Sequence, residues 1–237
     1  MLIDGDNAQP SLFGSMIAET SKYGVVSIRR IYGDWTTTNM NGWKEVLNSH
    51  AIQPVQQFRY SVGKNATDSA MIIDAMDILY ERLVSGFCLV SSDSDFTRLA
   101  TRIREKGLFV MGIGNLNTPK AFVNACERFV HVENLQLEES QTQATQDPKP
   151  KVDQIVKPLD PVPMLRKAVD SCVQDDGWAF LAEVGSRLQK LDPAFDARTY
   201  GHKQLSPLFK AHSREFEIKT KGGTSLVRIR AAEKAAS

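Results

Sequence analysis

The feature that most constrains the fold is an alternation, across residues 1–135, of short β-rich runs with segments that carry a helical pattern of apolar residues. The β-rich runs are Leu2-Ile3, Val25–Tyr32, Phe87–Ser91 and Leu108–Ile113. The helical segments are Ser11–Tyr23, Asn41–Ser49, Thr67–Val84, Asp95–Glu105 and Thr118–Ala125. Strands that alternate with helices predict an α/β fold, in which a doubly wound parallel sheet carries helices on both faces. Ligands bind such sheets at the carboxyl ends of the strands.

Residues 136–161 are predicted to form a linker between a first domain at 1–135 and a second at 162–237. The stretch is poor in large apolar residues and rich in Gln and Thr, and prolines stiffen it and its C-terminal border. The charge also divides there, because 13 basic and 14 acidic residues precede the linker whereas 13 and 9 follow it. The overall balance of 29 basic and 28 acidic residues therefore conceals a basic C-terminal part, which suits a polyanionic partner.

The second domain is predicted to be a small winged helix of the α+β class. Helical patterns cover Val162–Val173, Trp178–Leu188 and Tyr200–Ala211, and two β-rich runs follow, at Phe216–Thr220 and Leu226–Ile229. A Gly-Gly pair between these runs indicates a hairpin turn. Three helices followed by a β-hairpin are typical of the winged-helix fold, which is related to the helix-turn-helix.

Cysteine usage and hydropathy predict a cytoplasmic protein without membrane contact. The three cysteines are an odd number without C-x-x-C spacing, which excludes a disulfide framework and a zinc finger. No apolar run reaches the roughly 18 residues of a membrane helix, and the N-terminus MLIDGDN is acidic where a signal peptide is basic. Only three residues precede Asp4, whereas a central strand usually has about five, so we expect the native chain to start upstream of Met1.

Two pairs of carboxylates directly follow apolar runs of the predicted sheet. Asp4 and Asp6 follow the first run in LIDGDN, and Asp93 and Asp95 follow a later one in CLVSSDSDF. Parallel strands end at one rim, so we expect both pairs there, with Asp68 in the first turn of a neighbouring helix. Converging carboxylates repel one another unless a cation lies among them, and oxygen ligands suit Mg²⁺ or Mn²⁺. Such an ion activates water for hydrolysis of a phosphodiester.

Each of these residues also has a structural interpretation. Asp is common as a turn former or helix N-cap, and the helix dipole favours a carboxylate at the position of Asp68. Asn7 would either orient a ligating carboxylate or stabilise a turn, and Lys64 would either pair with a phosphate or lie solvated at the surface. Two acidic pairs, each after an apolar run, leave the functional and structural interpretations evenly balanced on residue pattern alone.

Three motifs, LIDGDN at 2–7, GKNATD at 63–68 and SSDSDF at 91–96, occur in an order and spacing that resemble the NYN domain. This PIN-like nuclease module, here of the LabA-like branch, would cover almost all of residues 1–135. The resemblance implies a PIN-like sheet and a metal-dependent endoribonuclease. It implies Asp4, Asp68 and Asp93 as metal-binding carboxylates, with Asp95 as a fourth. Asn7 would order this site, and Ser92 would touch a metal-bound water or a phosphate.

The second domain resembles the LOTUS domain, also called OST-HTH, through DGW at 176–178, LAEVG at 181–185, and FD at 195–196 followed by YG at 200–201. The resemblance implies RNA binding or protein docking. RNA phosphates would contact basic side chains, for which the candidates are Arg198, Lys203, Lys210, Lys219, Lys221 and Arg228. Solvated surface charge is the structural alternative for these residues. Trp178 is expected to be a core anchor rather than a platform for bases.

Together these features predict a ribonuclease whose LOTUS domain recruits RNA, and they are compatible with a protein partner and with a homodimer. A second hypothesis is an RNA-binding scaffold whose acidic site is inactive. The third and least favoured is a phosphatase with Asp4 as nucleophile and Asp6 as acid, because it leaves the motif at 63–68 without a role.

Overall fold

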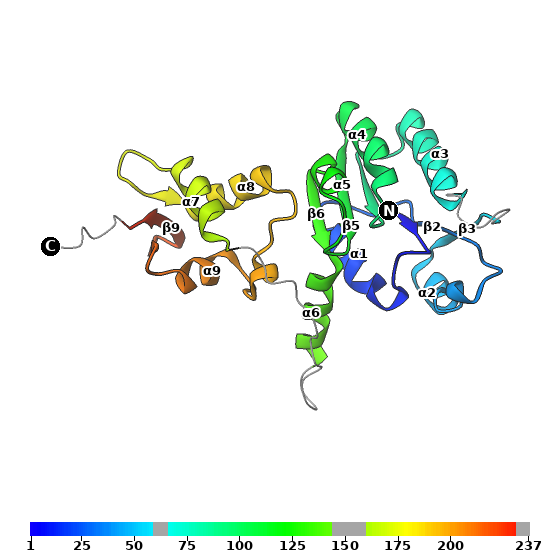
Figure 1. Ribbon diagram of the computed structural model, residues 1–237, viewed down its shortest axis with the longest axis horizontal. Coiled ribbons are helices and arrows are strands. Elements are labelled where there is room, and N and C mark those ends of the chain that lie inside the picture. Colours follow the sequence, from blue (N-terminus) through cyan, green and yellow to red (C-terminus); the bar gives the residue numbers. More distant parts are fainter. Residues whose placement is uncertain (59–65, 144–159, 231–237) are drawn as a thin grey trace. The chain divides into compact units, whose positions relative to one another are not determined.

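A computed structural model describes residues 1–58, 66–143 and 160–230 of the chain (Figure 1). The chain divides into two compact units, Met1–Thr145 and Gln146–Ser237. Within the described ranges, no helix has both the length and the apolar character needed to cross a membrane.

The N-terminal unit is built on a six-stranded sheet in the order β3-β2-β1-β4-β5-β6. Every pair of neighbours is parallel. The strands are β1 (Leu2–Asp4), β2 (Arg30–Gly33), β3 (Gln53–Gln56), β4 (Gly86–Val90), β5 (Phe109–Gly114) and β6 (Arg128–His131). The chain proceeds from β1 toward one edge, returns to β4 beside β1, and then proceeds toward the other edge. This reversal is the topological switch point of a doubly wound sheet.

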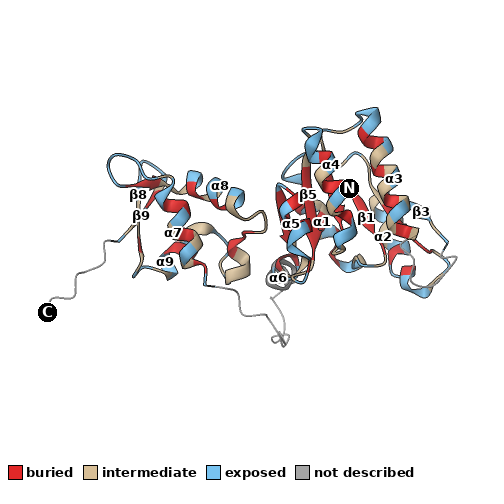
Figure 2. Cartoon of the chain, turned by 45° about the horizontal axis from the view of Figure 1, so that its top comes forward, coloured by how far each residue is buried: buried red, intermediate tan, exposed pale blue. Residues whose placement is uncertain are grey.

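Helices cover both faces of this sheet (Figure 1). Right-handed crossovers on either side of the switch point place the two sets of helices on opposite faces. One set is α1 (Phe13–Ser21), α2 (Trp43–His50) and α6 (Val132–Gln143), and the other is α3 (Ala66–Glu81), α4 (Thr97–Glu105) and α5 (Lys120–Ala125). Under the first set, Met16, Trp43 and Leu135 pack against Ile3 and Ile31 in one buried cluster. Burial is concentrated in the strands between the helical layers (Figure 2).

The predicted α/β alternation is confirmed, but three elements of this unit were not predicted. β3 is an edge strand in which three of four residues are exposed, so it lacks an apolar run. β6 has only four residues. α6 continues to Gln143, eight residues into the stretch predicted as linker, so ordered structure extends further than expected. The predicted run Val25–Tyr32 forms a strand only from Arg30 onward.

The C-terminal unit has the predicted helices and wing. It contains α7 (Val162–Asp170), α8 (Leu181–Leu191) and α9 (Leu205–Ala211), and an antiparallel sheet in the order β7-β9-β8, formed by Ala179–Phe180, Thr224–Ile229 and Phe216–Lys221 respectively. Gly222 and Gly223 join β8 to β9 with φ angles of 57° and 80°. A two-residue hairpin turn with positive φ at both positions requires such residues, so the predicted Gly-Gly turn is confirmed.

Two helix boundaries in this unit differ from the prediction. The helix expected from Trp178 begins at Leu181, because Ala179 and Phe180 instead pair with Val227 and Leu226 of β9. The helix expected from Tyr200 begins at Leu205, because Gly201 ends the preceding 3-10 turn (Ala197–Tyr200) in the left-handed conformation. Pro207 then lies in the first turn of α9, where its missing N–H leaves no hydrogen bond unmade.

Candidate metal centre

The predicted acidic residues meet at the rim where β1 and β4 end. Asp4 is the last residue of β1, and Asp93 and Asp95 follow β4 in the loop and 3-10 turn that lead into α4. Asp68 lies in the first turn of α3. Because β1 and β4 are paired neighbours on either side of the switch point, the fold brings these carboxylates to the position where doubly wound sheets bind ligands.

The turn after β1 explains why its motif contains a glycine. The Gly5 N–H donates to the backbone carbonyl oxygen of Tyr32 at 2.9 Å. A Cβ atom at residue 5 would lie 2.8 Å from that oxygen, so only glycine fits without a shift of the backbone. The close approach lets the chain turn back, and the Asn7 amide thereby reaches Asp4.

Asp4 is buried, with 1% exposure, and several donors hold its carboxylate. Its Oδ2 accepts hydrogen bonds from Asn7 Nδ2 at 2.6 Å and Ser91 Oγ at 2.9 Å, and its Oδ1 accepts one from the Asp6 N–H at 3.2 Å. Burial raises the pKa of Asp4, and the Asn7 and Ser91 hydrogen bonds oppose that rise. The Asn7 contact joins two of the residues predicted for this site.

Ser91 is a site residue that sequence reasoning missed. Its hydroxyl donates to Asp4 and also accepts a hydrogen bond from the Asp93 N–H at 3.1 Å. It therefore connects the carboxylate of β1 to the loop that carries Asp93. Ser92, which was predicted instead, accepts a hydrogen bond from the Asn115 N–H at 2.9 Å and so ties this loop to β5. The available signal was the position of Ser91 directly after an apolar strand.

Asp68, Asp93 and Asp95 form the closest carboxylate group. Each offers one oxygen atom, and these atoms all lie within 4.8 Å of one another. Asp68 and Asp93 are half-buried and Asp95 is exposed. Asp93 is also the N-cap of the following turn, where its Oδ1 accepts from the Asp95 N–H at 2.9 Å. The capping bond leaves other lone pairs of this carboxylate unused, so it is compatible with the predicted ligating role of Asp93.

The electrostatics of this group favour a cation. Burial raises the pKa of Asp68 to about 6, and the negative charges of Asp4, Asp93, Asp95 and Asp6 contribute to the rise. Like charges held this close stabilise the protonated form unless a positive charge joins them. An all-oxygen donor set is what Mg²⁺ and Mn²⁺ prefer, so the residues present fit either ion. Lys64, the remaining predicted residue of this region, lies outside the described residues.

The predicted RNA-binding residues of the C-terminal unit fall into three groups. Arg198 is 11% exposed and donates to Asp196 Oδ2 at 2.6 Å, so it belongs to a buried ion pair rather than to the surface. Lys219 Nζ and Arg228 Cζ lie 3.7 Å and 4.6 Å from the ring centroid of Trp178, which is buried as expected. The remaining members, Lys203, Lys210 and Lys221, are exposed, as is Arg228, which also pairs with Glu217.

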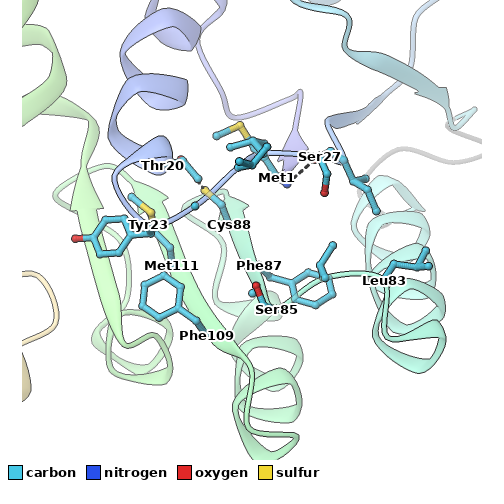
Figure 3. A pocket seen from close by; sticks show the side chains of 16 residues that line it. Met1, Thr20, Tyr23, Ser27, Leu83, Ser85, Phe87, Cys88, Phe109 and Met111 are labelled. Atoms are coloured by element: carbon cyan, nitrogen blue, oxygen red, sulfur yellow. Dashed lines mark hydrogen bonds between the residues drawn. The ribbon is translucent and has the colours of Figure 1, made fainter.

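The N-terminal unit also has a cavity of about 360 Å³, which does not include the acidic residues (Figure 3). It is at the amino ends of the strands, where Met1 precedes β1 and Phe109 begins β5. Among its described lining residues there is no acidic, basic or histidine side chain. We therefore assign the candidate site to the opposite rim.

A parallel sheet in this order, flanked by helices and with carboxylates at its switch point, places the N-terminal unit in the PIN-like class of α/β proteins. Residues 1–135, more than half of the chain, match the NYN domain, and the protein belongs to that family. Residues 158–228 match the OST-HTH/LOTUS domain. A nuclease-type family joined to this domain supports a ribonuclease or RNA-binding role.

Comparison with individual proteins adds two similar solved structures. The solution structure of an uncharacterised protein from Nitrosomonas europaea is 29% identical, with a TM-score of 0.31, and the match covers 40% of this chain and 97% of that one. The crystal structure of a protein of unknown function from Vibrio parahaemolyticus is 17% identical, with a TM-score of 0.47, and the match covers 55% and 90%. No curated protein matches the chain.

Proposed function

We propose that the protein is a metal-dependent endoribonuclease that hydrolyses RNA phosphodiester bonds at the β1–β4 rim, with the OST-HTH unit recruiting the RNA. Asp68, Asp93 and Asp95 would hold Mg²⁺ or Mn²⁺, with Asp4 beside them as a further carboxylate. The bound ion would polarise the phosphoryl group and lower the pKa of the attacking water. The observation that carries the proposal is the group of three carboxylate oxygens within 4.8 Å.

The chain's own residues supply the order of this site. Asn7 and Ser91 donate to Asp4 and fix the direction of its carboxylate, and Ser91 also holds the backbone of Asp93. Hydrogen bonds of this kind to ligating carboxylates keep a metal site in its binding geometry. The Ser92 hydroxyl accepts from the Asn115 N–H and keeps its own proton available for a phosphate oxygen or a water.

The OST-HTH unit would attract RNA through its exposed lysines. Lys203, Lys210 and Lys221 present solvated charges, which favour sequence-independent phosphate contact that weakens with salt. Lys219 and Arg228 lie over Trp178 and would add phosphate contacts from the β8–β9 hairpin.

The three cysteines are free thiols, in keeping with a reaction in the cytoplasm.

The geometry counts against a phosphatase that uses Asp4 as nucleophile. The carboxylate of Asp4 is buried, and both of its oxygens accept hydrogen bonds, Oδ2 from two side chains and Oδ1 from the Asp6 N–H. A nucleophile must instead present a free oxygen to the phosphorus atom.

The proposal is tested by incubating labelled single-stranded RNA with Mn²⁺, Mg²⁺ or EDTA. We expect cleavage with either metal, none with EDTA, and a loss of at least about 100-fold in Asp93→Asn, because catalytic electrostatics of this kind are worth that much. Asp77→Asn is the matched control, since Asp77 is exposed farther along α3. Cleavage that survives both EDTA and Asp93→Asn would overturn the proposal. RNA that is bound but left intact with every metal would instead support an RNA-binding protein with an inactive site.

A further inference from the structure

A groove runs between α3 and α4, and its lining begins about one helical turn beyond the carboxylates at their N-terminal ends. Both helices begin there, because Asp68 is in the first turn of α3 and Asp95 immediately precedes α4. The two helices lie side by side (Figure 1). The hollow between them has a volume of about 300 Å³, and its lining includes Ile72 and Met76 from α3 and Arg98 and Arg102 from α4. We call it the α3–α4 groove.

Arg98 is not explained by the stability of its own helix. It is the second residue of α4, where the positive end of the helix dipole disfavours a cation. Its side chain is exposed, and no ion pair joins it to another residue within the described ranges. An exposed guanidinium that destabilises its helix slightly, and that lies beside the candidate metal centre, is available for an anionic substrate.

Arg102 lies one turn farther along the same side of α4, about 6 Å along the helix axis at 1.5 Å per residue. Its Nε lies 3.4 Å from Glu105 Oε2, and its side chain is 52% exposed. An exposed pair of this kind contributes little free energy. A phosphate can therefore replace Glu105 as the partner of Arg102 with little loss of free energy.

The opposite wall of the groove is apolar. Ile72 and Met76 are one turn apart on α3, and both are half-buried. Thr101, also in the lining, donates its hydroxyl to the Thr97 carbonyl oxygen and makes no demand on a ligand. Guanidinium groups facing apolar side chains suit a ligand with anionic groups on one side and flat apolar surfaces on the other. A single nucleic-acid strand has this distribution.

We propose that the α3–α4 groove binds the strand of RNA that leads away from the cleavage site, with Arg98 and Arg102 contacting successive phosphates next to the scissile one. The inference rests on the proposed function for the identity of the substrate. It adds the direction in which the strand leaves the metal centre and two binding residues that none of the three motifs of this unit contains.

The test uses the full chain with Asp93→Asn, which is expected to bind RNA without cutting it. Single-stranded RNA containing 4-thiouridine is photo-crosslinked to this protein, and the attached peptides are identified by mass spectrometry. We expect crosslinks on α3 or α4 that are lost when Arg98→Gln and Arg102→Gln are combined. Lys44→Gln is the control, because Lys44 is exposed on α2, on the other face of the sheet.

Fluorescence anisotropy across a salt series gives an independent readout. Removing one phosphate contact from a single strand should lower the slope of log affinity against log salt by about 0.7. We expect this decrease and a weakening of about fivefold to tenfold for each arginine variant, and neither change for Lys44→Gln. Crosslinks confined to the OST-HTH unit, or arginine variants with unchanged slopes, would overturn the proposal that this groove binds RNA.

The readouts separate this inference from the proposed function. Crosslinks in the groove without cleavage by the unsubstituted protein would support RNA binding in the groove and refute the proposed nuclease activity. Metal-dependent cleavage that is unchanged in Arg98→Gln and Arg102→Gln would support the proposed nuclease activity and refute RNA binding in the groove.

Discussion

Asp68→Asn should stabilise the metal-free protein at neutral pH. The substitution removes a half-buried negative charge from among four other carboxylates while keeping nearly the same shape. The rise in the Asp68 pKa from 3.8 to about 6 corresponds to at most ~3 kcal/mol. Because this side chain is half-buried, solvent screening reduces the expected gain to ~1 kcal/mol. For a unit of this size, that gain raises the melting temperature by about 3 °C.

The pH dependence of this effect has a definite sign. The folded state holds the Asp68 proton more tightly than the unfolded state, because the folded-state pKa is the higher one. The stability of the unsubstituted protein therefore falls as the pH rises from about 4 to about 6, and the full penalty is present above that window. Asp68→Asn should thus stabilise the protein at pH 7.5 and have little effect at pH 4.

Differential scanning calorimetry of the full chain, with EDTA or with Mn²⁺, checks both parts of this reasoning. The transition that Mn²⁺ shifts in the unsubstituted protein reports the N-terminal unit. At 100 times its dissociation constant, the ion should stabilise that unit by about 2.7 kcal/mol, and Asp68→Asn should lose most of this gain. Asp77→Asn, on the exposed side of the same helix, should change stability by less than about 0.5 kcal/mol. An apo Asp68→Asn protein that melts lower at pH 7.5, or that gains equally at pH 4, would refute the argument.

Three further substitutions test the supporting structure. Asn7→Ala removes a hydrogen bond of 2.6 Å to Asp4 and should weaken Mn²⁺ binding 10- to 100-fold by isothermal titration calorimetry; unchanged affinity would contradict the orienting role. Gly5→Ala places a Cβ 2.8 Å from a backbone carbonyl oxygen and should lower the free energy of unfolding by about 1–3 kcal/mol in urea, whereas a neutral effect would show that the turn can relax. Asp196→Ala removes the carboxylate that pairs with the largely buried Arg198 and should destabilise the C-terminal unit by about 3 kcal/mol, seen as a shift of that unit's calorimetric transition alone; an unshifted transition would place the pair at the solvated surface.

Much of the candidate site could be predicted because parallel strands impose a simple rule. Their carboxyl ends meet at one rim, so Asp4 and Asp93 were expected at the same rim once the alternation of strands and helices was recognised. Only the structure shows that β1 and β4 are neighbours there. The resemblance of three short motifs to the NYN domain then implied a metal-binding role for Asp68, which alone would pass for an ordinary residue of a first helical turn. Short strands were not predicted because their own residues carry too little pattern. A two-residue strand such as β7 is defined by its pairing with β9.

The choice between adjacent serines shows what local sequence leaves open. Successive side chains after a strand point in different directions, and the register of β4 against β1, which pairs Val90 with Ile3, turns Ser91 toward Asp4. Ser92 instead reaches β5. No pattern within SSDSDF contains that register, because it is set by strand pairing over a separation of almost ninety residues.

Residue patterns alone predicted the two-domain plan, the doubly wound sheet, the rim that carries the carboxylates and the basic character of the C-terminal unit. These properties follow from local periodicity, from composition and from the geometry common to all parallel sheets. The solvation and pairing of individual charged side chains became known only from the folded chain. The tertiary structure buried Arg198 against Asp196, brought Asp68, Asp93 and Asp95 within reach of one ion, and left Arg98 exposed beside them. Those outcomes depend on packing between distant segments, which sets the solvation and the charged neighbours of each side chain.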